Sequence, residues 1–160
     1  MKVVYLLCGY FLLISLPGIA QTNTPLVNFN NPSSVAAARG YSHAAAVDLG
    51  TCTMLLIAGQ VALDSSGNLV GKNNMEQQTE QVFRNIENII KANGGSMQDL
   101  VKIQYFVTDI SAIGAVRSIR DKYVNIKQPP VSTLVQATKL FRDDVLIEIE
   151  GTAIIPKKRQ

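Results

Sequence analysis

The amino-acid sequence predicts an α+β domain, in which a β-sheet carries two helices packed on one face. Three observations predict this class: an almost wholly apolar run at residues 53–63, a helix-period stripe within 73–95, and strict alternation of side chains at 100–109. Strands and helices that each have an apolar side bury those sides against one another in layers. The 160 residues are 47% hydrophobic and 17% charged, which suits one compact domain.

The expected order of elements is β-β-α-β-α-β-β, with strands at about 40–47, 53–63, 100–109, 128–136 and 145–155 and helices at 73–95 and 111–123. The first helix is the clearest, because Asn74 can cap its start and Gly94–Gly95 can end it. Its predicted core stripe comprises Met75, Thr79, Val82, Phe83, Ile86, Ile89 and Ile90.

The strand at 100–109 is expected to alternate without interruption. Its apolar face comprises Val101, Ile103, Tyr105 and Val107. Phe106 then falls on the polar face. An aromatic ring there indicates a contact with a partner or the wall of a cleft, although a lone exposed ring is the commoner outcome.

The last strand carries two carboxylates, Glu148 and Glu150, on the face opposite Ile147 and Ile149. A buried carboxylate such as Glu148 can hold an attacking water and exchange protons with it. The alternative is that both glutamates form a solvated strand face.

Residues 1–20 have the order of a secretory signal peptide. Lys2 precedes an apolar run from Val3 to Leu16, and a site of small residues ends at Ala20. The run is shorter than the ~20 residues that a membrane span needs. We therefore expect cleavage after Ala20, export to the periplasm or the medium, and no stable membrane association. A retained membrane anchor is the alternative.

The remainder is expected to divide into a flexible leader at 21–38, a domain at 39–157 and a basic tail at 158–160. The Lys-Lys-Arg cluster at 157–159 indicates a contact for RNA or acidic lipid, or simply a frayed terminus. The net charge is +3 and the other basic residues are scattered, so the sequence predicts no nucleic-acid partner.

The sequence lacks the motifs of metal sites, nucleotide-binding loops and serine-histidine-acid catalytic triads. His43 is the one histidine, Cys52 is the one cysteine after residue 20, and no H-x-x-x-H or C-x-x-C spacing occurs. The sequence also lacks G-x-x-x-x-G-K-[ST], G-x-G-x-x-G and G-x-S-x-G. We expect no metal or organic cofactor. The remaining polar candidates lie at strand ends: Tyr41, His43, Gly59, Gln60, Ser132, Thr133 and Glu148.

Six segments together resemble the reactive intermediate deaminase (RidA-like) family, once called translation-inhibitor endoribonucleases. They are GYSHAAAV, IAGQVALD, QTEQVFRNIENIIKANGGS, VKIQYFVTD, PPVSTLV and IEIEGTA, and the similarity spans residues 39–155. The resemblance implies a chorismate-mutase-like fold and a homotrimer whose sheets form a central barrel, with small-molecule clefts between subunits. Archetypal members hydrolyse enamines and imines such as 2-aminoacrylate to 2-keto acids and ammonia without a cofactor.

The resemblance also implies roles for single residues. Glu148 matches the family's glutamate that positions water. Gly59 matches the residue whose backbone contacts the ligand, and Tyr41 matches the tyrosine that opens the first strand. His43, Gln60, Phe106 and Thr133 are further expected ligand-binding residues.

The family's carboxylate-gripping arginine is expected in a P-x-R segment. Here that segment is Pro130-Val131-Ser132, so Ser132 stands where the arginine belongs. Arg117, or else Arg120, on the second helix would replace the missing charge. The alternative is that Arg117 faces solvent.

The sequence therefore leads to two hypotheses about a RidA-like protein with an intersubunit cleft. The first is a hydrolase or deaminase acting on imines, enamines or related small carbonyl compounds, with Glu148 steering water. The second is a non-catalytic small-metabolite-binding protein, which the serine at position 132 favours over the deamination of classical 2-imino acids. Ribonuclease activity rests only on the older family name.

Overall fold

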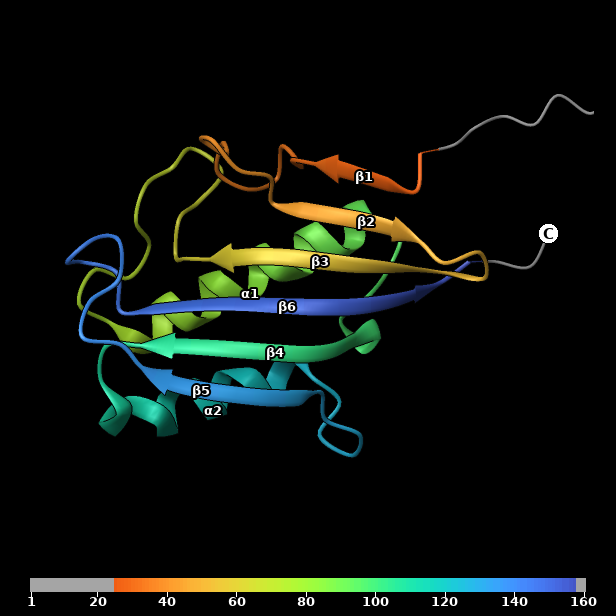
Figure 1. Ribbon diagram of the computed structural model, residues 1–160. Coiled ribbons are helices and arrows are strands. Elements are labelled where there is room, and N and C mark those ends of the chain that lie inside the picture. Colours follow the sequence, from red (N-terminus) through yellow and green to blue (C-terminus); the bar gives the residue numbers. More distant parts are fainter. Residues whose placement is uncertain (1–24, 158–160) are drawn as a thin grey trace, which may run out of the picture.

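The computed structural model describes residues 25–157 and contains one sheet of six strands. The expected signal peptide and basic tail lie outside the described residues. The strand order across the sheet is β1-β2-β3-β6-β4-β5, and only β4 and β5 are parallel (Figure 1). The strands are β1 (Val27–Asn30), β2 (Ala44–Asp48), β3 (Cys52–Gln60), β4 (Leu100–Val107), β5 (Val131–Gln136) and β6 (Ile147–Pro156).

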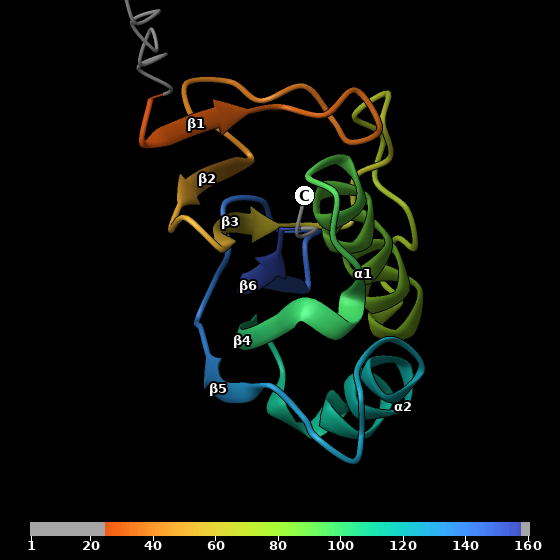
Figure 2. The ribbon, with the colours of Figure 1, turned by 90° about the vertical axis from the view of Figure 1, so that its right-hand side faces the viewer.

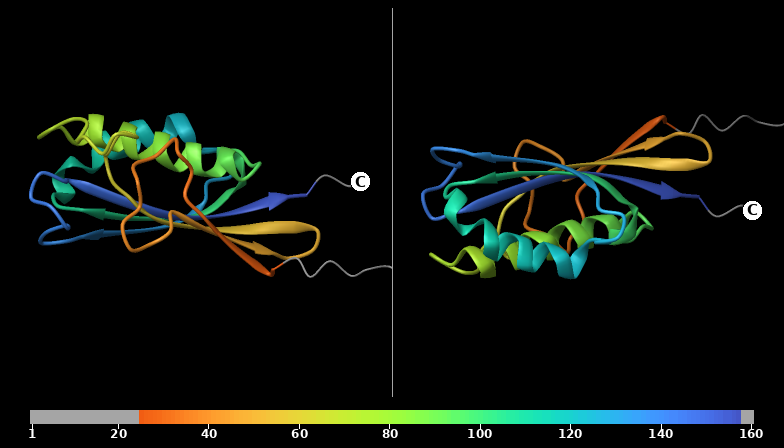
Figure 3. Two further views of the ribbon diagram at one scale, coloured as in Figure 1. Left: turned by 90° about the horizontal axis from the view of Figure 1, so that it is seen from above. Right: turned by 90° about the horizontal axis from the view of Figure 1, so that it is seen from below.

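Two helices, α1 (Met75–Ala92) and α2 (Ile113–Tyr123), cover one face of the sheet, and no helix of residues 25–157 lies on the other face (Figures 2 and 3). The Asn74 side chain caps α1 by accepting a hydrogen bond from the Gln77 amide, and Gly94 follows its end with φ +82°. The α+β class that the sequence predicts is confirmed.

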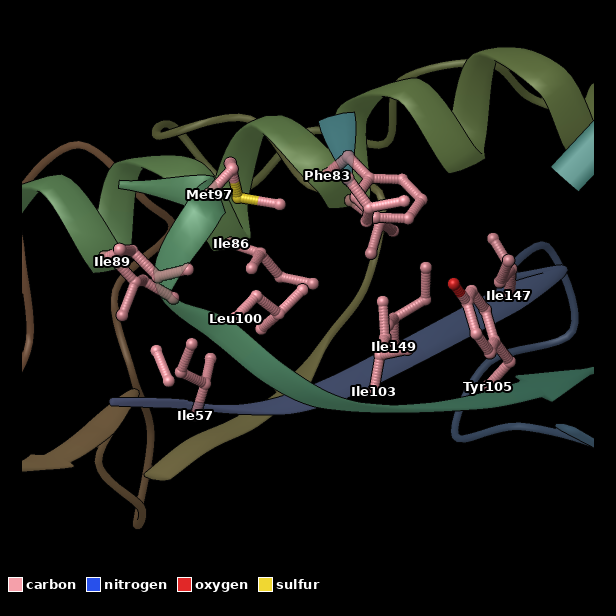
Figure 4. Close-up of a cluster of buried hydrophobic side chains, with 14 of the residues drawn as sticks. Ile57, Phe83, Ile86, Ile89, Met97, Leu100, Ile103, Tyr105, Ile147 and Ile149 are labelled. Carbon is pink, nitrogen blue, oxygen red and sulfur yellow. The ribbon is translucent and has the colours of Figure 1, made fainter. Parts of the chain in front are cut away.

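The core lies between α1 and the central strands. Phe83, Ile86 and Ile89 of α1 pack against Ile103 and Ile149 of the sheet, and all five side chains have 0% exposure (Figure 4). The helical stripe read from the sequence is thus the buried face of α1, with Met75 only partly buried at its beginning. Burial of such side chains stabilises the fold by ~1.5–3 kcal/mol each.

The first strand was not expected. Residues 27–30 pair antiparallel with β2, and Val35 is buried in the core at 3% exposure. The expectation of a flexible leader is therefore wrong for this part of 21–38. The segment is rich in Asn, Pro and Ser, but backbone hydrogen bonds to the edge of β2 compensate for its weak strand propensity.

The alternation of β4 is broken at Val101. The pairing with β6 shifts between Leu100 and Lys102, so Val101 is an extra residue in a β-bulge. Leu100 is buried and Val101 is 42% exposed. The expectation that Val101 shares the buried face with Ile103 is wrong, because the bulge reverses the alternation before Lys102.

Candidate functional site

The candidate site is a cleft of about 780 Å³ at one end of the sheet. Residues from four parts of the chain line it: the segment 36–41 before β2, the segment 58–67 at and after the end of β3, the loop residues 141–142, and Glu148 near the start of β6. These parts of the chain come together because β2 begins, β3 ends and β6 begins at the same end of the sheet (Figure 1).

Glu148 and Gly59 are in direct contact. A Cβ atom built on Gly59 would lie 2.8 Å from Cδ of Glu148 and closer still to Oε1, so only glycine leaves room for this carboxylate. The β3–β6 register shifts between Ile57 and Gln60, which places Gly59 in an irregular stretch beside Glu148. Both residues are site candidates from the sequence, and the structure brings them together in the cleft.

The Glu148 carboxyl holds its proton more tightly than an exposed glutamate does. It is half-buried, and burial raises its pKa above the ordinary value of 4.5, with the negative charge of Glu150 raising the pKa further. Among the described residues no donor contributes a hydrogen bond to it. Its oxygens are therefore available to water or to a ligand.

Tyr41 also lines the cleft. The residue is 50% exposed, and its edge-to-face contact with His43 has a ring-centroid distance of 5.2 Å. Burial raises the pKa of the Tyr41 phenol and the charge of Glu148 raises it further, so Tyr41 remains a neutral hydrogen-bond donor beside that carboxylate at pH 7.

His43 and Gln60 lie behind the cleft instead of lining it. The Nε2 atom of His43 lies 2.7 Å from the Ala36 carbonyl oxygen, and its Nδ1 atom lies 3.2 Å from Nε2 of Gln60. These partners assign the tautomer with hydrogen on Nε2, because a carbonyl only accepts and an amide nitrogen only donates. With both ring nitrogens engaged, His43 holds the 36–41 wall in place.

Two buried amides of α1 hold the other walls. Gln78 donates from Nε2 to the carbonyl oxygen of Asp144 at 2.8 Å and accepts from the Leu146 amide at 2.8 Å, which fixes the loop before β6. Asn85 donates to the carbonyl oxygens of Val61 and Leu63 at 3.0 and 2.9 Å. The cleft is therefore built on hydrogen bonds from the rigid helix.

Three other predicted residues occupy different places on the sheet. Phe106 is the direct cross-strand partner of Glu148 but does not line the cleft. Thr133 is paired with Gln104 on the helix-free side. Ser132 is paired with Ile103, whose side chain is in the core, so Ser132 lies on the helix-facing side and not on the side of Glu148.

Arg117 also lies away from the cleft. It is an exposed residue of α2. Figure 2 shows α2 beside one face of the sheet. Its neighbour Arg120 pairs with Asp121 at 2.7 Å. Within one protomer neither arginine lines the cleft.

Among the lining residues that the sequence analysis did not predict are the large side chains Arg39, Phe141 and Arg142. Arg142 donates two hydrogen bonds to Asp144, at 2.8 and 2.6 Å, whereas Phe141 is 63% exposed. A large aromatic residue in the otherwise polar stretch 141–144 was the available signal. Arg39 had the weaker signal of standing two residues before Tyr41.

Residues 25–157 contain no group of three or more His, Cys, Asp or Glu side chains that could hold a metal ion. The same part of the chain has no helix of the length and apolar character that crossing a membrane requires.

The model of the family described as Endoribonuclease L-PSP matches residues 31–155. The chain belongs to this family. It is the RidA-like family that the sequence predicts. Membership of the L-PSP family supports a small-molecule-binding or deaminase-like function.

Relatives within the L-PSP family include Protein HMF1 of Saccharomyces cerevisiae, 31% identical over 130 residues, which cover 81% of this chain and 95% of HMF1. RidA from an Antarctic Psychrobacter has a similar structure, with a TM-score of 0.70, 29% identity and coverage of 80% and 99% of the two chains. Escherichia coli TdcF with bound serine gives a TM-score of 0.67 at 25% identity, covering 79% and 98%.

Proposed function

We propose that this protein hydrolyses small imines, enamines or related carbonyl compounds, with Glu148 positioning the attacking water. The contact between Glu148 and Gly59 in the cleft carries this proposal. It presents a carboxylate with no hydrogen-bond donor among the described residues, beside an accessible backbone, in a cleft that two arginines, Arg39 and Arg142, also line. That is the arrangement needed to orient water against a planar, electrophilic carbon.

The proposed reaction consumes one water and releases ammonia. Glu148 accepts a proton from the water as the oxygen bonds to the imine carbon, and it passes that proton to the nitrogen as the C=N double bond becomes single. Glu148 then takes the proton of the new hydroxyl group as the carbonyl forms and delivers it to the nitrogen, which leaves as ammonia, so that Glu148 returns to its ionised state. The raised pKa of Glu148 makes it a better base than an ordinary carboxylate.

The second candidate is a non-catalytic protein that binds small metabolites in the same cleft. Two observations favour it: β5 carries no arginine, and a structural relative, TdcF, holds serine. Both candidate functions use the same ligand cleft. They differ only in whether Glu148 catalyses a reaction of the bound ligand.

We further propose that the protein is an exported homotrimer. The helix-free face exposes Phe29, Leu56, Val131 and Val135 by 66%, 43%, 69% and 45%, and apolar groups exposed together on one face favour a covering subunit. A sedimentation experiment that finds only monomer excludes the trimer. Amino-terminal sequencing of protein from the medium or periplasm tests export, which requires a mature chain beginning near Gln21.

The decisive experiment generates 2-aminoacrylate in situ and follows keto-acid formation by the purified mature protein. Wild type is expected to accelerate formation, and Glu148→Gln to lose roughly 100-fold or more of that acceleration, since general-base catalysis is worth about that factor. Glu150→Gln is the matched control and should retain activity. No acceleration by wild type, with ligand binding intact, establishes the binding protein instead.

A further inference from the structure

Two arginines line the cleft, and they differ in their partners. Arg142 is neutralised by two hydrogen bonds to Asp144. Arg39 is exposed and takes part in no ion pair among residues 25–157. Arg39 is therefore the cleft cation whose charge and donors remain available to a ligand.

Arg39 also stands on a fixed segment. Four residues further on, His43 is buried and its ring bonds to the carbonyl of Ala36, so both ends of a short loop are tied together. Gly40 turns the chain directly after Arg39 with φ +79°. A guanidinium on a tied loop loses less conformational freedom when it binds an anion.

The rest of the lining is mainly apolar. Val61, Leu63 and several alanines contribute to it, and Phe141 is 63% exposed at the loop before β6. A volume of about 780 Å³ lies in the upper part of the range of typical small-molecule sites and is far more than a three-carbon acid fills.

We propose that the cleft binds organic carboxylates with a bulky apolar substituent, with Arg39 pairing with the carboxylate and Phe141 contacting the substituent. This inference rests on the proposed ligand cleft and names its ligand class. Arg39 supplies the charge that neither Ser132 nor Arg117 brings to the cleft. A guanidinium can form two parallel hydrogen bonds to a carboxylate, and a planar ring offers a face for an aryl or branched alkyl group.

The test measures binding of three probes by isothermal titration calorimetry to the mature protein: 2-oxo-4-phenylbutanoate, its primary amide, and pyruvate. The apolar acid is expected to bind at least roughly tenfold more tightly than either the neutral amide or the small acid. Raising the salt concentration should weaken binding of the acid and leave binding of the amide unchanged.

Arg39→Gln should weaken binding of the apolar acid roughly tenfold or more without changing binding of the amide, and Arg39→Lys should restore part of the loss. The double variant Arg142→Gln/Asp144→Asn removes an equal positive charge together with its partner and should leave the preference for the acid in place. Phe141→Ala should weaken the apolar acid severalfold and leave pyruvate unchanged. Unchanged melting temperatures exclude misfolding as the cause.

The inference is overturned if wild type binds the acid and the amide equally or binds none of the probes. It is also overturned if Arg39→Gln weakens binding of the acid and of the amide to the same extent. The proposed hydrolysis fails separately. If 2-aminoacrylate is not turned over but binding of the acid depends on Arg39, the ligand class stands without catalysis. If Glu148-dependent turnover occurs and Arg39→Gln leaves KM for acidic substrates unchanged, the ligand class falls and the hydrolase stands.

Discussion

Gly59 lies against the carboxylate of Glu148 so closely that a methyl group on Gly59 would meet Cδ of Glu148 at 2.8 Å. The contact joins the irregular end of β3 to the start of β6, and both residues line the cleft. Because Glu148 is followed along β6 by the fully buried Ile149, its backbone has little freedom to move away. The position of the carboxylate therefore depends on the absence of a side chain at residue 59.

Gly59→Ala should displace the Glu148 carboxylate and abolish the proposed turnover. The cost of overpacking is expected to lower the free energy of unfolding by ~1–3 kcal/mol. Gly114→Ala is the control: its Cβ meets no atom within 4 Å, and alanine should stabilise α2 by ~0.5–1 kcal/mol. Denaturant unfolding and the keto-acid assay measure the two effects. Full activity in Gly59→Ala contradicts a role for this contact.

The pH dependence of activity should report the ionisation of Glu148. Its folded-state pKa lies above 4.5, so the base form is lost as pH falls, with a midpoint above 4.5 in the profile of kcat/KM. Glu150→Gln removes the second cause of the shift and should move the midpoint to lower pH. Carbon-13 NMR titration of the glutamate carboxyls checks the assignment even without turnover. A midpoint unaffected by Glu150→Gln would mean that another group controls the profile.

The raised pKa of Glu148 also determines how the free energy of unfolding changes with pH. The folded protein binds the Glu148 proton more tightly than the unfolded chain, so this group lowers the free energy of unfolding as pH rises from 4.5 through its folded pKa. In Glu148→Gln that decline is absent. Urea unfolding of both proteins across this pH window measures the difference, and parallel curves would contradict the raised pKa.

The elements that the sequence predicts best are those with local signals. The stripe on α1 and the Asn74 cap are fixed by spacing within one helix, and both are present. The first strand was missed because its stability comes from pairing with β2 and not from its own composition. The bulge at Val101 was missed because an extra residue in one strand is defined only against its partner strand.

The candidate site shows the same limit. Gly59, Tyr41 and Glu148 follow from family motifs, and they lie in one cleft. Arg39 and Phe141 come from loops more than 100 residues apart, and their meeting depends on how the strands are ordered. Ser132 illustrates the sensitivity of strands, because an error of one residue in alignment moves a side chain to the other face of the sheet.

Gln78→Leu should destabilise the loop that precedes β6. Leucine has a similar size but leaves the Leu146 amide and the Asp144 carbonyl without their partner, and each buried unpaired group costs ~1–3 kcal/mol. We expect the free energy of unfolding to fall by ~2–4 kcal/mol and hydrogen exchange at the Leu146 amide to accelerate. The exposed neighbour Gln77→Leu should change stability by less than ~0.5 kcal/mol. Equal effects in the two variants would show that Gln78 does not anchor this loop.

An arginine introduced on β5 should interact with Glu148 when it stands at position 133 and not when it stands at position 132. Thr133 pairs with Gln104, which in turn pairs with Glu150, so its side chain lies on the same face as Glu148. Two strand spacings, about 9.6 Å, separate β5 from β6, a span that two long side chains bring within Coulombic reach. Ser132 lies on the helix-facing side.

Thr133→Arg should therefore lower the pKa of Glu148, because a nearby positive charge stabilises the carboxylate, and Ser132→Arg should leave it unchanged. The carbon-13 titration compares the two variants directly, and the keto-acid assay shows whether the new charge also raises turnover of 2-aminoacrylate. A larger effect from Ser132→Arg would reverse this assignment of faces. It would restore the sequence interpretation that Ser132 occupies the position of the family's arginine.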